Sequence, residues 1–164
     1  MPGLDWLTAR PVAHRGLHDA AGGIVENTAS AFSAAVAGGY AIECDLQLSA
    51  DGEAMVFHDD RLGRLTGRDD AVKSLSAAEL KAIAFRATPD RMLTLGELCD
   101  LVAGRVTLVL ELKSHFDRET ALAARVAAVL EGYAGPVAAM SFDPVMVKRL
   151  QAAASGLPRD GLTR

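Results

Sequence analysis

Charged residues interrupt apolar stretches of this sequence where strands are expected. Glu43 and Asp45 lie inside one such stretch, and Glu111 and Lys113 end another. Residues two apart in a strand point to the same face of a sheet, so each pair presents its side chains together. A charge buried in a sheet costs free energy unless it is paired or coordinates a metal. The pattern therefore predicts one site to which several strand ends contribute.

Strand-like and helix-like segments alternate along the chain. Strands are predicted at 11–13, 41–46, 54–58, 106–113 and 136–140, and another begins within 158–163. Helices are predicted at 27–37, from 76, from 94 to near 104, at 117–130 and at 145–154. This order predicts an α/β fold with a parallel sheet and helices outside it, of the TIM-barrel (β/α) type. Because a closed barrel usually needs about 250 residues, we expect an incomplete barrel of about four to five βα units.

Several helix starts carry capping signals. Ser76 and Thr94 each precede a glutamate by three residues, which is the capping-box pattern. Asp143 precedes a proline that suits the first helical position. Asn27 is equally well read as a helix cap or as a site residue. Residues 1–164 are expected to form a single domain, with an insertion at about 59–90 that contains one short helix.

The overall charge and the cysteines limit the class of protein. The chain has 17 basic and 21 acidic residues, a net charge of −4, which gives no electrostatic reason to bind nucleic acid or an anionic membrane. No stretch approaches the roughly 20 apolar residues of a membrane span. Cys44 and Cys99 are expected to be core residues and not a disulfide. We therefore expect a cytoplasmic protein.

Three carboxylates at one sheet edge would repel one another and raise their own pKa values. A hard divalent cation such as Mg²⁺ or Ca²⁺ resolves that conflict, because these ions prefer oxygen ligands. The alternative is polar alternation on an exposed edge strand. The apolar neighbours Ile42 and Leu46 favour a buried strand and hence a metal site formed by Glu43, Asp45 and Glu111.

Two histidines and two cations complete the candidate chemistry. His14 and His58 suit proton transfer, because imidazole titrates near neutral pH. Arg15 and Lys113 would hold an anionic group such as a phosphate. Asp59 either orients His58 or forms a turn. The remaining histidines, at positions 18 and 115, are expected to be peripheral, and Glu26 could orient Arg15.

The ordered motifs resemble the glycerophosphodiester phosphodiesterase family. They are His14-Arg15-Gly16, Glu26-Asn27-Thr28, Glu43-Cys44-Asp45, His58-Asp59 and Glu111-Leu112-Lys113, with further similarity at 65–67 and 141–144. The resemblance implies a TIM barrel and metal-dependent hydrolysis of small-molecule glycerophosphodiesters to glycerol 3-phosphate and an alcohol.

The resemblance also implies a role for each candidate residue. Glu43, Asp45 and Glu111 would bind Mg²⁺ or Ca²⁺, and Arg15 and Lys113 would hold the phosphate. The two histidines would be the acid/base pair, in an order that the sequence leaves open. The insertion would cover the glycerol side of the site.

The short sheet leaves other interpretations open. An open half-barrel would expose two sheet edges and apolar surface. The chain could therefore be a non-catalytic remnant or binding subunit that needs a partner chain, or a homo-oligomer in which two copies complete the half-barrel. A narrower alternative is a related phospholipase that acts on lipid phosphodiesters.

Overall fold

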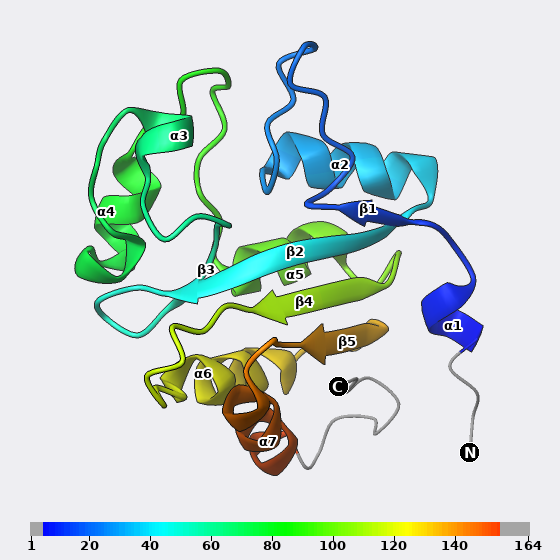
Figure 1. The fold of residues 1–164 in the computed structure, drawn as a ribbon. Coiled ribbons are helices and arrows are strands. Elements are labelled where there is room, and N and C mark those ends of the chain that lie inside the picture. The colour runs from blue at the N-terminus through cyan, green and yellow to red at the C-terminus, as the bar shows by residue number, and fades with distance from the viewer. Residues whose placement is uncertain (1–4, 155–164) are drawn as a thin grey trace.

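The computed structural model describes residues 5–154 and is built on one sheet. Its parallel strands lie in the order β1 (Val12–His14), β2 (Ala41–Leu48), β4 (Leu108–Leu112) and β5 (Val137–Met140) (Figure 1). The short strand β3 (Ala54–Val56) pairs antiparallel with the end of β2. The predicted parallel α/β fold of TIM-barrel type is confirmed. Within residues 5–154 the sheet is open, with β1 and β5 at its ends.

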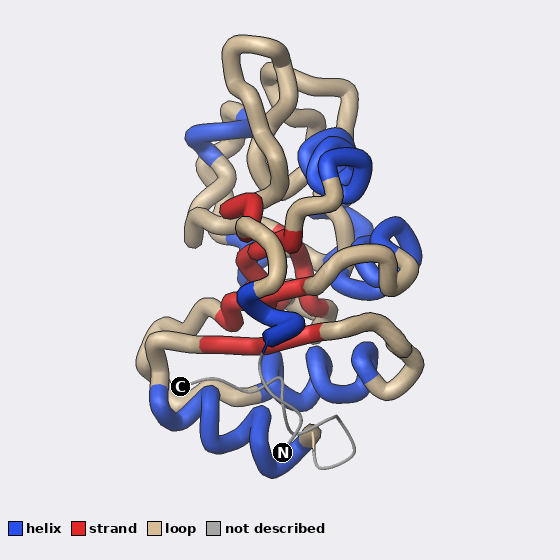
Figure 2. The backbone as a smooth tube through the Cα atoms, turned by 90° about the vertical axis from the view of Figure 1, so that its right-hand side faces the viewer, coloured by secondary structure: helices blue, strands red, loops and turns tan. Residues whose placement is uncertain are grey.

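The longer helices alternate with the parallel strands: three of them connect successive parallel strands, and the last follows β5. They are α2 (Ala29–Gly38), α5 (Leu95–Val102), α6 (Ala121–Leu130) and α7 (Pro144–Ala153), and a short α1 (Asp5–Thr8) precedes the sheet. In Figures 1 and 2, α6 and α7 lie at one end of the molecule, and the loops around α3 and before α2 lie at the other.

Alternation along the strands separates the hydrophobic core from the polar face. The core residues of β2 are Ile42, Cys44 and Leu46, and they pack with apolar residues of the helix layer such as Phe32 and Leu98. The residues between them face the other way and include the acidic pair predicted from the sequence. Since β2 lies between β1 and β4, its backbone polar groups are paired on both sides and the strand is buried along nearly its whole length.

The segment 59–90 packs around a second hydrophobic cluster. It contains α3 (Gly63–Thr66), the 3₁₀ helix η1 (Val72–Ser74) and α4 (Ala77–Ala82). The prediction of one short helix here was wrong, because single turns such as α3 are too short to show a helical period. The cluster also includes Phe57, whose ring stacks on Phe85 at 6.3 Å between centroids.

The capping predictions had mixed outcomes. Ser76 and Thr94 both form complete capping boxes, and Asp143 accepts a hydrogen bond from the Val145 N–H, as predicted. The interpretation of Asn27 as a helix cap was wrong: Thr28 occupies the N-cap position of α2.

Element ends were predicted less well. The helix predicted from residue 117 begins instead at Ala121, after an irregular stretch. The strand predicted to begin within 158–163 lies outside the described residues.

Candidate functional site

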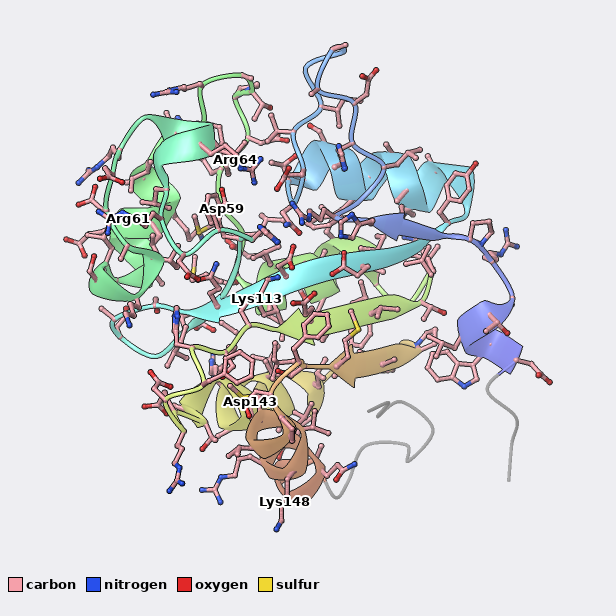
Figure 3. All side chains as sticks on the ribbon, viewed as in Figure 1. Asp59, Arg61, Arg64, Lys113, Asp143 and Lys148 are labelled. Atoms are coloured by element: carbon pink, nitrogen blue, oxygen red, sulfur yellow. The ribbon has the colours of Figure 1, made fainter. Side chains whose placement is uncertain are left out.

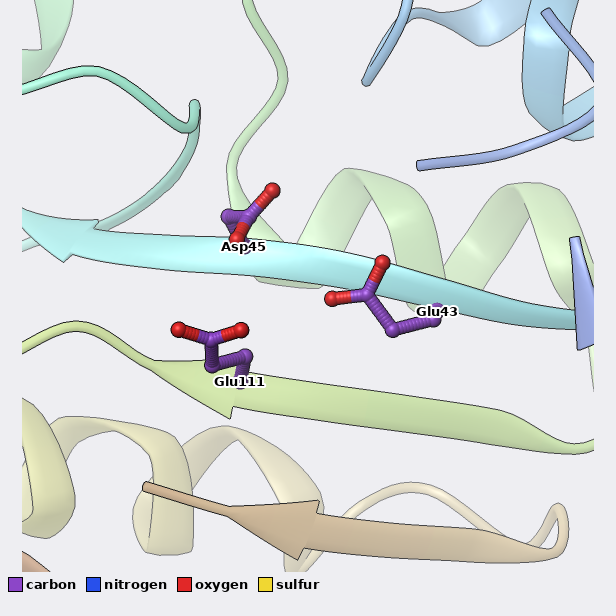
Figure 4. Close-up of side chains that lie close together, drawn as sticks. All are labelled: Glu43, Asp45 and Glu111. Atoms are coloured by element: carbon purple, nitrogen blue, oxygen red, sulfur yellow. The ribbon is translucent and has the colours of Figure 1, made fainter. Parts of the chain in front are cut away.

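Three buried carboxylates converge on the polar face of the sheet (Figure 4). Glu43 and Asp45 lie two apart on β2, and Glu111 on β4 is in register with Asp45. One carboxylate oxygen from each residue lies within 4.8 Å of the others. The alternative of an exposed edge strand was wrong, because β2 is interior to the sheet and all three residues are buried.

The three carboxylates carry more negative charge than their surroundings favour. Burial, and after it the charges of Asp45 and Glu111, raise the pKa of Glu43 to about 7. The backbone N–H of Arg15 donates to Glu43 Oε2 at 3.0 Å and opposes this effect. The cluster therefore favours a cation.

Lys113 supplies part of that positive charge. Its Nζ donates to Glu111 Oε1 at 2.8 Å and lies 3.0 Å from Asp45 Oδ1. Burial lowers the pKa of Lys113, but its contacts with the two carboxylates outweigh this and raise it overall. The lysine predicted at this strand end is thus a charged neighbour of the acidic cluster.

The carboxylate oxygens of the cluster suit a divalent cation as ligands. Within the described part of the chain, the buried atom Glu43 Oε1 has no hydrogen-bond donor, and the Lys113 ammonium is the group that faces Asp45 Oδ1. Buried acceptors without a donor are costly, and carboxylate oxygens are the ligands that Mg²⁺ and Ca²⁺ prefer. Glu43, Asp45 and Glu111 could therefore hold a metal ion.

Asn27 belongs to this cluster and not to the helix start. Its side chain is buried, and Nδ2 donates to Asp45 Oδ2 at 3.0 Å. Its backbone has φ +55°, a left-handed conformation that asparagine adopts more readily than most residues. Its N–H donates to the Arg15 carbonyl at 2.9 Å. Asn27 thereby ties the loop after β1 to the acidic residue at the centre of the site.

A tight turn after β1 presents the N–H of Arg15 to Glu43. Arg15 and Gly16 both have positive φ, +58° and +81°. A Cβ at position 16 would lie 2.8 Å from the Cβ of Ala31 on α2, so only glycine fits without displacement. The His-Arg-Gly motif thus combines two side chains of the site with the turn that holds them against α2.

The two candidate histidines approach from different elements. His14 ends β1 opposite Glu43, with Nε2 3.8 Å from Glu43 Oε2, and its side chain is 68% exposed. His58 follows β3, and its Nδ1 lies 2.7 Å from Asp59 Oδ1. The structure therefore places Asp59 where it can orient His58, one of the two roles that the sequence left open.

Gln47 supports the loop that carries His58, and its residue type alone offered no chemical reason to select it. Its buried Nε2 donates to the Phe57 carbonyl at 2.9 Å and to the Asp59 carbonyl at 2.8 Å. Gln47 lies two residues beyond Asp45 on the same face of β2, so the same strand holds the acidic cluster and the histidine loop. The period-2 pattern continues to this position and could have indicated it.

Arg15 contacts acidic residues on two sides. Its Nη1 donates to Glu26 Oε1 at 2.9 Å, the contact predicted from the sequence, and its Nε lies 3.5 Å from Asp45 Oδ2. Glu26 also accepts hydrogen bonds from Arg64 of α3, which the sequence analysis missed. The similarity at 65–67 lies directly beside Arg64 and was the available signal.

The remaining candidates lie outside the cluster. His18 and His115 are exposed, and His115 Nδ1 is 3.9 Å from Asp60 Oδ2.

Cys44 and Cys99 are buried free thiols. Between residues 5 and 154, no helix has both the length and the apolar character needed to cross a membrane.

Comparison with known proteins identifies the family. Residues 14–164 match the model of the glycerophosphoryl diester phosphodiesterase family. The chain belongs to this family. A glycerophosphodiester phosphodiesterase of Caldanaerobacter subterraneus is 35% identical over 111 residues, covering 63% of this chain and 44% of that protein. A glycerophosphodiester phosphodiesterase of Bacillus altitudinis is 43% identical over 70 residues, covering 42% of this chain and 27% of that protein. The chain thus spans less than half the length of these relatives.

Solved structures of phosphodiesterases share this fold. An Oleispira antarctica phosphodiesterase in complex with the product sn-glycerol-3-phosphate aligns with a TM-score of 0.78 at 28% identity, covering 89% of this chain and 63% of that one. A glycerophosphodiester phosphodiesterase from Agrobacterium tumefaciens aligns with a TM-score of 0.75 at 28% identity, covering 90% and 64%.

Proposed function

We propose that this chain carries the metal-binding and phosphate-binding part of a glycerophosphodiester phosphodiesterase, which hydrolyses glycerophosphodiesters to glycerol 3-phosphate and an alcohol. The observation that carries the proposal is the convergence of three buried carboxylates beside Arg15 and Lys113. Family membership supports it, as does the glycerol 3-phosphate product held by the Oleispira antarctica phosphodiesterase.

In this proposal Glu43, Asp45 and Glu111 hold one Mg²⁺ or Ca²⁺ ion. When bound, such an ion polarises a phosphoryl oxygen and offsets negative charge that develops during phosphoryl transfer. The unsatisfied Oε1 of Glu43 supports this assignment, because it is buried and lies with the oxygens of Asp45 and Glu111 in one cluster.

Arg15 and Lys113 bind the phosphate. Each lies next to Asp45, so the diester would be bound beside the carboxylates. Arginine offers a planar set of N–H donors that matches phosphate oxygens, whereas lysine acts as a compact charge. The two residues lie on different strand ends, which favours contact with two different oxygens of one phosphate.

His14 and His58 transfer the protons. One imidazole takes the proton from the attacking hydroxyl as the new P–O bond forms. The attacking group is either water or a glycerol hydroxyl of the substrate; in the second case a cyclic phosphate forms, which water then opens to glycerol 3-phosphate. The other imidazole gives its proton to the oxygen of the departing alcohol as the old P–O bond breaks. Asp59 accepts from Nδ1 of His58, which leaves Nε2 free to exchange the proton.

The proposal extends to the domain and its location. Residues 1–164 form one domain in which 59–90 covers the glycerol side of the site. This is supported by the second hydrophobic cluster, which packs the segment against β3. The buried thiols Cys44 and Cys99 are compatible with the cytoplasmic location that the sequence predicts.

The test is release of glycerol 3-phosphate from glycerophosphocholine by size-fractionated protein, with Mg²⁺, with Ca²⁺ and with a chelator. We expect metal-dependent turnover, abolished in Glu43→Gln and reduced roughly 10²- to 10⁴-fold in His58→Ala. The control is Asp69→Asn, which alters the exposed ion pair between Arg61 and Asp69 in the segment 59–90. Turnover that survives chelation and both substitutions would refute the proposal.

Three further outcomes separate the alternatives. Metal binding without turnover in folded protein would favour a binding subunit that needs a partner chain. Activity confined to the fraction with twice the mass would favour two copies that complete the sheet. Faster release from lysophosphatidylcholine than from glycerophosphocholine would favour a phospholipase.

A further inference from the structure

One arginine joins two separate parts of the candidate site. Arg64 lies on the single-turn helix α3, within the segment 59–90 (Figure 3). Its Nε and Nη2 donate to the two oxygens of Asp59 at 2.6 and 3.0 Å. Its Nη1 and Nη2 donate to the two oxygens of Glu26 at 3.1 and 2.7 Å. A single guanidinium group therefore binds two carboxylates, each through both oxygens.

Each of these carboxylates contacts a residue of the proposed chemistry on its other side. Asp59 Oδ1 lies 2.7 Å from His58 Nδ1. Glu26 Oε1 accepts from Arg15 Nη1 at 2.9 Å. A continuous series of contacts thus runs from the imidazole that follows β3, through Arg64, to the guanidinium that follows β1.

We propose that Arg64 is a positioning residue, which fixes Asp59 and Glu26 so that His58 and Arg15 face the same phosphodiester. The inference rests on the proposed function. It goes beyond that function because Arg64 contacts neither the acidic cluster nor the proposed proton path directly. Asp59 held in this way keeps the Nδ1 proton of His58 in place and leaves Nε2 as the exchanging atom.

The charges along the series support this assignment. The hydrogen bond from Arg64 lowers the pKa of Asp59 to about 2. Burial raises the pKa of Glu26, but hydrogen bonds from Arg64 and then Arg15 outweigh it and lower the pKa overall. Both carboxylates are therefore ionised near neutral pH and accept charge-assisted hydrogen bonds.

The geometry requires arginine and not only a positive charge. Four N–H···O contacts to two carboxylates need the planar fork of a guanidinium, whereas a lysine ammonium is a compact charge on a flexible stem. Arg64 is 47% exposed, and exposed ion pairs contribute little to stability. Its replacement should therefore alter the position of His58 and Arg15 more than it alters folding.

The same segment provides a matched control. Arg61 also pairs with an aspartate, Asp69, and is 58% exposed. Among the carboxylate residues that the structure describes, Arg61 contacts only Asp69. These bonds therefore do not link Arg61 to His58 or Arg15. Arg61→Gln removes a comparable surface ion pair without touching the series.

The experiment compares Arg64→Gln, Arg64→Lys and Arg61→Gln by two readouts. The first is ¹⁵N NMR of the His58 ring at about pH 8, where an imidazole is largely neutral and its tautomer can be read. The second is kcat and KM for glycerophosphocholine. We expect both Arg64 variants to lose the preference for the Nδ1–H tautomer. We also expect kcat/KM to fall roughly 10- to 100-fold, with Arg61→Gln unchanged in both readouts.

Exogenous guanidinium should restore part of the rate of Arg64→Gln and leave the rate of Arg61→Gln unchanged. Wild-type-like His58 spectra in both Arg64 variants would overturn the proposal, as would full activity in Arg64→Lys. The spectra report the tautomer of His58 even if wild-type protein shows no turnover. Failure of the proposed function is therefore distinguishable from failure of this inference. Circular dichroism checks that each variant is folded. If Arg64→Gln does not fold, the milder variant Arg64→Lys still allows the test.

Discussion

Replacement of Asn27 tests whether this residue supports the acidic cluster, as its contacts indicate. Asn27→Ala removes the hydrogen bond to the buried carboxylate of Asp45 and places a Cβ-bearing residue without a polar side chain at φ +55°. Asn27→Gly removes the same hydrogen bond but accepts the left-handed backbone. Comparison of the two variants therefore separates the hydrogen bond from the backbone conformation.

The expected magnitudes follow from these two contributions. A hydrogen bond to a charged group contributes about 1.5–3 kcal/mol to stability. Alanine in the left-handed region costs about 1–2 kcal/mol. Asn27→Ala should thus lower the free energy of unfolding by about 2.5–5 kcal/mol. Asn27→Gly should be about 1 kcal/mol more stable than Asn27→Ala, because the entropy of glycine in the unfolded chain offsets part of the relief.

The assay is urea unfolding followed by circular dichroism, in the presence of chelator so that metal binding does not enter the comparison. A decrease of less than about 1 kcal/mol in the free energy of unfolding of both variants would refute the role of the hydrogen bond, since the bond to Asp45 would then contribute nothing. Equal stability of the two variants would refute the role assigned to the left-handed backbone.

Two further predictions concern the same face of β2. The pKa of Glu43 is about 7 in the folded state and 4.5 in the unfolded state, so the folded state binds the proton more tightly and metal-free stability falls as pH rises between these values. That loss amounts to about 3 kcal/mol, and Glu43→Gln should abolish it in urea unfolding measured across this pH range with chelator. An unchanged pH dependence in the variant would contradict the assignment. Gln47→Leu leaves the carbonyls of Phe57 and Asp59 without their donor, so we expect a loss of about 1–3 kcal/mol in the same assay and broadened NMR signals from His58. Wild-type stability in Gln47→Leu would show that water replaces both bonds.

The acidic cluster could be predicted from the sequence because it depends on strand periodicity and on the order of the parallel strands. Glu43 and Asp45 share a face by their spacing, and the apolar residues between and around them indicate a buried strand. The parallel order of the strands then places Glu111 beside them. Local pattern and sheet topology agree here, so the prediction needed no knowledge of individual side-chain contacts.

The supporting contacts could not be predicted in the same way. Asn27 was ambiguous because its role depends on a positive φ that the sequence does not specify. Arg64 was missed because it lies on a helix of one turn and contacts Glu26, 38 residues earlier in the chain. Gln47 was passed over because its partners are backbone carbonyls, which any sequence provides. Such contacts arise from tertiary packing and not from local propensity.

The central claim is that Glu43, Asp45 and Glu111 hold a divalent cation, and a crystal structure with Mn²⁺ tests it most directly. Mn²⁺ accepts oxygen ligands as Mg²⁺ and Ca²⁺ do and gives an anomalous signal that identifies it. We predict one anomalous peak with an oxygen of each of the three carboxylates within about 2.0–2.6 Å. A peak absent from this position at saturating Mn²⁺, with Lys113 still bonded to Glu111 as it is in this structure, would contradict the account.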